Sequence, residues 1–125
     1  MTKNKALYSW FNQFMTFYRD TAVPDDAEFP YGTYTYVDDA WDGASGGQAA
    51  ITVNLWYRTE SEAVPDEMAK EIASAIGYGG TIVNCDEGYL WIKKGSPWCQ
   101  SITDATDSAI KRRYINITVD YLTFD

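Results

Sequence analysis

The sequence predicts an α+β domain in which two helices pack on one face of a four- to five-stranded mixed or antiparallel sheet. Three observations predict this class. The segments follow the order helix, strand, strand, helix, strand, strand, strand; the strands alternate between apolar and polar residues; and 125 residues is an ordinary length for one domain. Because two helices can cover only one face of such a sheet, residues 1–125 are predicted to form a single domain.

The first helix is predicted at about residues 4–18. Apolar residues recur there at spacings of three and four, which is typical of an amphipathic helix. They are Leu7, Trp10, Phe11, Phe14 and then Phe17 or Tyr18. The helix cannot run far beyond this stripe, because Pro24 disfavours helical backbone in the residue before it.

Two strands are predicted next, at residues 31–37 and 48–58, and they are expected to pair as a long hairpin. In the second strand Ile51 and Val53 share one face while Thr52 and Asn54 share the other. Residues 38–47 are the most loop-like stretch of the chain. We expect this tip to be mobile in the free protein and ordered on assembly.

A second helix is predicted at about residues 64–76, with Pro65 in its first turn and Gly77 at its C-terminal cap. Residues 81–85 and 89–94 are expected to form a hairpin whose turn uses Gly88 at positive φ. Residues 95–109 look irregular and polar. The last strand is predicted at about 111–124, with Ile115 and Ile117 on one face and Tyr114 and Asn116 on the other.

Composition limits the function. A net charge of −8 argues against a general nucleic-acid binder and against binding to anionic membranes. The chain has no histidine, which removes His-based triads and His-containing zinc sites. Cys85 and Cys99 are expected to be reduced, and no metal or cofactor is expected. The start of the chain does not resemble a signal peptide, so we expect folding in a cytoplasm.

The predicted tip, with its four residues Asp38, Asp39, Trp41 and Asp42, invites comparison with a calcium loop, because Asp38, Asp42 and Gly43 fit the pattern of such a loop. Two key ligand positions of that loop would be Ala40 and Ala49, so a solvated tip of turn-forming residues is the better interpretation. A carboxylate-based enzyme built on such pairs is a weak alternative, and we predict that the chain is not an enzyme.

Aromatic residues make up 16% of the chain, and Tyr and Trp are enriched at protein interfaces. Trp56 is therefore interpreted as a core or interface residue. Lys111, Arg112 and Arg113 form the single basic run, interpreted as a solvated strand edge or as a bridge to acids on a neighbouring subunit. Together with the four tip residues, these are the candidate assembly interface. The tryptophans leave a small ligand-binding module as another possibility.

Several segments, taken together, have a familiar order and spacing. They are the aromatic helix around Trp10-Phe11, Val23-Pro24, residues 29–34, residues 53–58 with Trp56-Tyr57-Arg58, residues 75–80, residues 90–97 around Trp91, and residues 114–119 and 121–123. No segment is a specific motif alone, but their order and spacing, over nearly the whole chain, resemble the tail terminator (tail completion, or minor tail) proteins of long-tailed bacteriophages of the siphophage type.

The resemblance implies an α/β subunit of a ring, hexameric in the family, that caps the head-proximal end of the tail tube. The implied partners are copies of itself, the tail tube protein and the head–tail connector protein, with DNA passing through the lumen without specific binding. The implied location is the virion, after assembly in the host cytoplasm. A head–tail connector or neck protein of the same virion is the alternative, because such proteins have similar lengths.

Overall fold

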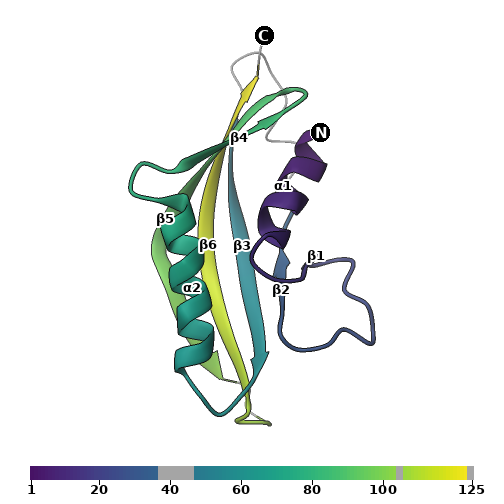
Figure 1. Cartoon of the computed structure of the whole chain (residues 1–125), viewed down its shortest axis with the longest axis vertical. Coiled ribbons are helices and arrows are strands. Elements are labelled where there is room, and N and C mark those ends of the chain that lie inside the picture. Colours follow the sequence, from purple (N-terminus) through teal and green to yellow (C-terminus); the bar gives the residue numbers. More distant parts are fainter. Residues whose placement is uncertain (37–46, 104–105, 124–125) are drawn as a thin grey trace.

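The computed structural model describes residues 1–36, 47–103 and 106–123. It is α+β, with two helices and one six-stranded mixed sheet (Figure 1). The elements are α1 (Lys3–Asn12), β1 (Phe17–Arg19), β2 (Tyr31–Tyr34), β3 (Gly47–Arg58), α2 (Ala63–Ile76), β4 (Thr81–Cys85), β5 (Gly88–Thr103) and β6 (Ile110–Thr123). The predicted class is confirmed, but the predicted count of four or five strands is too low.

The strand order is β1-β2-β3-β6-β5-β4, so the long strands β3, β6 and β5 form the centre. Each neighbouring pair is antiparallel except β1 with β2, which is parallel and makes the sheet mixed. The predicted pairing of the second strand with the one before it is confirmed as β2–β3. Residues 38–46 of the tip between them lie outside the described residues, as do Asp38, Asp39, Trp41 and Asp42.

Both helices lie on the same face of the sheet (Figure 1). Phe11 of α1 stacks on Tyr34, and Asp66 of α2 bonds Arg113. The register places Tyr34 beside Val53 and Arg113 beside Leu55, which share one side of β3. The core fills the space between this side and the helices. Its sheet residues include Ile51, Val53, Leu55, Leu90, Ile92, Ile115, Ile117 and Val119, all at most 1% exposed.

Helix α1 ends earlier than its apolar stripe predicts. The side chain of Asn12 donates from Nδ2 to the carbonyl of Tyr8 (2.9 Å) and accepts at Oδ1 from the backbone N–H of Phe17 (3.0 Å). These bonds close the last turn and hold the chain as it turns into β1. The placement of Phe17 and Tyr18 in the helix was therefore wrong, because they belong to the three-residue strand beneath it.

Replacing Asn12 with alanine should lower the free energy of unfolding by about 1–2 kcal/mol, because the partly buried N–H of Phe17 loses its acceptor. Urea unfolding followed by fluorescence measures the effect. Gln13→Ala, one residue further on and exposed, is the matched control and should change stability by less than about 0.5 kcal/mol. Equal effects of the two variants would contradict this role of Asn12.

Strand β5 is much longer than predicted, since residues 95–103 of the expected irregular stretch belong to it. Its register with β6 shifts between Lys94 and Cys99, at a bulge that contains Pro97. β4 pairs with β5 only as far as Ile92, so Pro97 lies where β5 has no outer neighbour. A proline is tolerated there because no ladder hydrogen bond is lost on that side.

Tyr34 is fully buried, and its hydroxyl has no hydrogen-bond partner in the described part of the chain. Burial raises the pKa of Tyr34 to about 12, and the nearby Arg19 only partly offsets this effect. Because the unfolded chain has a tyrosine pKa of about 10, it releases this proton first. The contribution of Tyr34 to stability is complete below about pH 10 and is lost as the pH rises to about 12.

Tyr34→Phe should therefore weaken the alkaline loss of stability by about 2–3 kcal/mol between pH 10 and pH 12. At pH 7 it should leave stability unchanged or raise it by about 1 kcal/mol, because an unsatisfied buried hydroxyl is removed. Urea unfolding at several pH values tests both expectations. Tyr78→Phe, at a fully exposed tyrosine, is the control, and a Tyr34→Phe protein with the wild-type alkaline profile would contradict the account.

Candidate interaction surface

The face of the sheet opposite the helices carries a mixture of aromatic, cationic and neutral polar side chains. We call this side the open face, because no helix among the described residues covers it. Strands β3 and β6 place alternate residues on it by their pleat. In β3 these are Thr52, Asn54, Trp56 and Arg58, and in β6 they are Arg112, Tyr114, Asn116, Thr118 and Asp120; all but the exposed Arg58 are half-buried. The face assignments made from the alternation are confirmed.

One row of cross-strand neighbours crosses four strands of the open face. Tyr31, Trp56, Arg112 and Ile102 are successive register partners on β2, β3, β6 and β5, and we call them the Trp56 row. The Tyr31 and Trp56 rings are nearly parallel, with centroids 6.3 Å apart and an angle of 18°. The Arg112 guanidinium lies over the Trp56 ring, 5.2 Å from its centroid. Since β2 and β6 flank β3, Tyr31 and Arg112 approach the indole from its two sides.

Other aromatic rings extend this row toward the edge of the sheet. Tyr18 of β1 meets Tyr31 edge to face at 6.0 Å, and Phe29 lies 5.5 Å from the same ring. Arg58 covers Phe29 at 5.0 Å and bonds Asp107 at 2.9 Å. Burial raises the pKa of Tyr31, so its hydroxyl stays neutral at physiological pH. This part of the open face is a neutral aromatic surface with its cations stacked on the rings.

A small pocket of about 170 Å³ opens beside Arg112. Trp56, Ile102, Ile110 and Arg112 line it, so its walls are apolar except for the guanidinium. Arg112 has no carboxylate partner within the described residues. The pocket therefore suits a side chain that combines a carboxylate with methylene groups.

The basic run is divided by the pleat of β6. Only Arg112 lies on the open face, while Lys111 and Arg113 are buried beneath the helices, at 8% and 1% exposure. Arg113 bonds Asp66 through Nε (2.8 Å) and the Glu62 carbonyl through Nη2 (3.3 Å), and Lys111 donates to the Ser108 carbonyl. β6 is also central in the sheet. The expectation of a solvated strand edge is therefore wrong, and Lys111 and Arg113 are not available to a neighbouring subunit.

The far end of the open face, near β4, has a different character. Lys93 bonds Asp120 at 2.8 Å and lies over the Trp91 ring at 4.4 Å. Beside them three apolar side chains are exposed: Ile82, Tyr89 and Leu122. The alternation predicted a polar outward side for β6, and the exposed Leu122 at its end was missed because a single residue does not make a pattern.

The two cysteines are free, and the register places them far apart. Cys85 pairs with Gly88, which pairs with Thr123, whereas Cys99 pairs with Ile115. Eight residues along β6 correspond to about 27 Å, well beyond disulfide reach. Burial raises the pKa of both thiols, which disfavours the nucleophilic thiolate.

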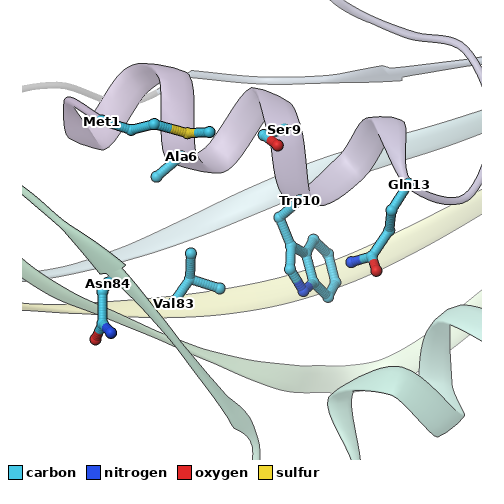
Figure 2. A pocket seen from close by; sticks show the side chains of 7 residues that line it. All are labelled: Met1, Ala6, Ser9, Trp10, Gln13, Val83 and Asn84. Atoms are coloured by element: carbon cyan, nitrogen blue, oxygen red, sulfur yellow. The ribbon is translucent and has the colours of Figure 1, made fainter.

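A groove of about 430 Å³ lies between α1 and β4 on the helical side (Figure 2). Trp10 and Ala6 reach down from α1 toward Val83, and Ser9 and Gln13 line its upper wall (Figure 2). The N-terminal amine of Met1 closes one end by its ion pair with Asp86 (3.1 Å). The side chains that line this groove offer no base to activate the Ser9 hydroxyl, so they form no nucleophile–base pair.

Within residues 1–36, 47–103 and 106–123, no cluster of three or more acidic or cysteine side chains could hold a metal ion. No helix in these ranges is long and apolar enough to cross a membrane. No family model, curated protein or solved structure matches the chain. The open face is the part of the described structure that bears most directly on function.

Proposed function

We propose that this chain is a non-catalytic structural subunit of a long-tailed phage virion that assembles into a ring at the head-proximal end of the tail tube. By the family resemblance the ring would contain six copies. It would end the growth of the tube and present a surface to the head–tail connector protein. The subunit would be assembled in the host cytoplasm and remain in the tail of the virion.

The observation that carries this proposal is the open face. A sheet covered by helices on one side only leaves an aromatic surface that a protein partner can bury, and Tyr, Trp and Arg are the residues enriched at interface cores. The resemblance of the sequence to tail terminators supplies the kind of partner. The charge of −8 per subunit is multiplied in a ring and favours the passage of DNA without adhesion.

The same face argues against the alternative of a sugar-binding module. A stacking platform needs a free ring face, and the indole of Trp56 has Tyr31 on one side and Arg112 on the other as close neighbours. The Trp56 row is therefore less suited to stack a sugar than to contact another protein.

The test uses purified protein, mass photometry and negative-stain electron microscopy. We expect ring-sized particles, and one ring bound at one end of tail tubes that lack a terminator. Binding to filled heads but not to tube ends would instead indicate the head–tail connector role. A chain that is monomeric at every concentration and ignores both tubes and heads would contradict the proposal.

A further inference from the structure

We infer that, within the ring of the proposed function, the open face of one copy receives the outer surface of α2 from the next copy. The contact places a glutamate of α2 in the pocket beside Arg112. This inference rests on the proposed function for the existence of the ring. Beyond the existence of a ring, the inference specifies which two surfaces of the subunit are in contact and which charged groups pair across that contact.

The receiving side is defined by an unsatisfied cation. Arg58 and Lys93 on the same face have carboxylate partners in Asp107 and Asp120. Arg112 has none among the described residues, although its side chain lines the pocket. A guanidinium donates most strongly to a carboxylate, in a fixed fork geometry. The pocket formed by Trp56, Ile102 and Ile110 is therefore a site for an acidic side chain.

The entering side is the surface of α2 that points away from the sheet. Pro65, Ala69, Ile72 and Ile76 face the core, which leaves Glu67 and Glu71 exposed one turn apart on the outer side. Val64 flanks them at 45% exposure and Ala75 is exposed beside them. Two carboxylates beside exposed apolar side chains are complementary to a pocket that has one cation and apolar walls.

The two surfaces lie on opposite sides of a two-layer molecule. Helix α2 packs on one face of the sheet, and the Trp56 row lies on the other face. A contact between them is front to back, with two different patches on each copy. Such heterologous contacts produce a closed ring when the rotation between copies closes. The use of two different patches, rather than one self-complementary patch, is what a ring requires.

Nucleic acid is a poorer occupant of the open face. Phosphate binding needs several free cations along a track. Two of the cations on this face are already neutralised by Asp107 and Asp120, and Arg112 alone would supply one contact. One carboxylate satisfies one guanidinium, so a protein partner with acidic side chains fits the charge count better.

Charge-reversal variants test the contact. Arg112→Glu makes the receiving side acidic, and Glu67→Arg/Glu71→Arg makes the entering side basic. Each variant alone brings like charges together at every contact, so we expect assembly at least about 10-fold weaker than wild type. In an equimolar mixture the acidic open face of the Arg112→Glu copy can meet the basic α2 surface of the double variant. The unchanged open face of the double variant can meet the unchanged α2 surface of the Arg112→Glu copy. The mixture should therefore form rings of alternating composition, measured by native mass spectrometry.

Two controls match the net charge changes at exposed residues outside both surfaces: Lys5→Glu for Arg112→Glu, and Asp20→Arg/Asp25→Arg for the double variant. Both should assemble like wild type. Circular dichroism and thermal melting check that each variant is folded, and the helix variant changes only exposed residues, where substitutions ordinarily alter stability little.

The outcomes separate the two proposals. Wild-type rings that persist in both charge-reversal variants would overturn this contact and leave the proposed function standing. So would variants that lose assembly and do not recover on mixing. A wild-type chain that forms no ring, alone or on tail tubes, would overturn both.

Discussion

Replacing Gly32 with alanine should destabilise the domain by about 3 kcal/mol, although alanine is ordinarily better than glycine in a strand by about 0.5–1 kcal/mol. A Cβ atom at this position would lie 2.4 Å from Cε2 of Phe17 and 2.5 Å from its Cζ. The Phe17 ring is fully buried against Phe11, with ring centroids 5.0 Å apart, so it cannot move aside without displacing the end of α1. Chemical unfolding measures the loss.

Gly79→Ala is the matched control, because a Cβ there meets nothing within 4 Å. It should be neutral or should stabilise slightly, by about 0.5 kcal/mol, through the entropy of the unfolded chain. The double variant Gly32→Ala/Phe17→Leu should recover part of the loss, since the smaller side chain frees the space. A Gly32→Ala protein as stable as wild type would show that the Phe17–Gly32 contact does not hold β1 in place.

This contact also explains why β1 was not predicted from the sequence. Three residues are too few to show an alternation, and Phe17 continues the helical spacing of Phe11 and Phe14. Two contacts separate Phe17 from the helix. The side chain of Asn12, five residues earlier, bonds the backbone of Phe17, and Gly32, distant in sequence, leaves room for the Phe17 ring. Neither contact shows in the spacing of apolar residues.

The long strands were predictable because they repeat one rule over many residues. In β3 and β6 the alternation runs for most of the strand, and a slip of one residue would bury Asn54 and Asn116. The end of β5 was missed because Pro97 and Ser96 suggest a loop. A proline argues against a central strand, but beyond Ile92 the outer side of β5 has no partner in the described sheet.

The candidate interface was predictable only in part. Trp56 and Arg112 were both selected, but their direct pairing depends on the β3–β6 register, which composition cannot supply. The sequence could have shown that Lys111 and Arg113 lie on the opposite face of the sheet from Arg112, because side chains alternate along a strand. Arg113 lies two residues before Ile115 and therefore shares its buried face. Residues Asp38, Asp39, Trp41 and Asp42 stay a prediction, because they lie outside the described residues.

The buried Arg113 gives the second large effect, and the two sides of its ion pair should behave differently. Asp66→Ala should cost about 2 kcal/mol, because Arg113, at 1% exposure, keeps only weaker contacts, with Glu62 at 3.3 and 3.6 Å and with the Arg112 carbonyl at 3.4 Å. Arg113→Met should cost less than about 1 kcal/mol or stabilise the domain, because water can solvate Asp66 and Glu62, whose side chains are 60% and 59% exposed.

The double variant Asp66→Ala/Arg113→Met should therefore be more stable than Asp66→Ala alone, since no charge is left buried without a partner. Urea unfolding of the four proteins gives the coupling free energy, and Glu67→Ala on the exposed side of the same turn is a control that should shift stability by less than about 0.5 kcal/mol. Additive effects of the two substitutions would mean that Arg113 is held by packing alone. Because Asp66 lies in the first turn of α2, coupling would instead show that the sheet fixes the start of the helix that we propose as the subunit's contact to its neighbour.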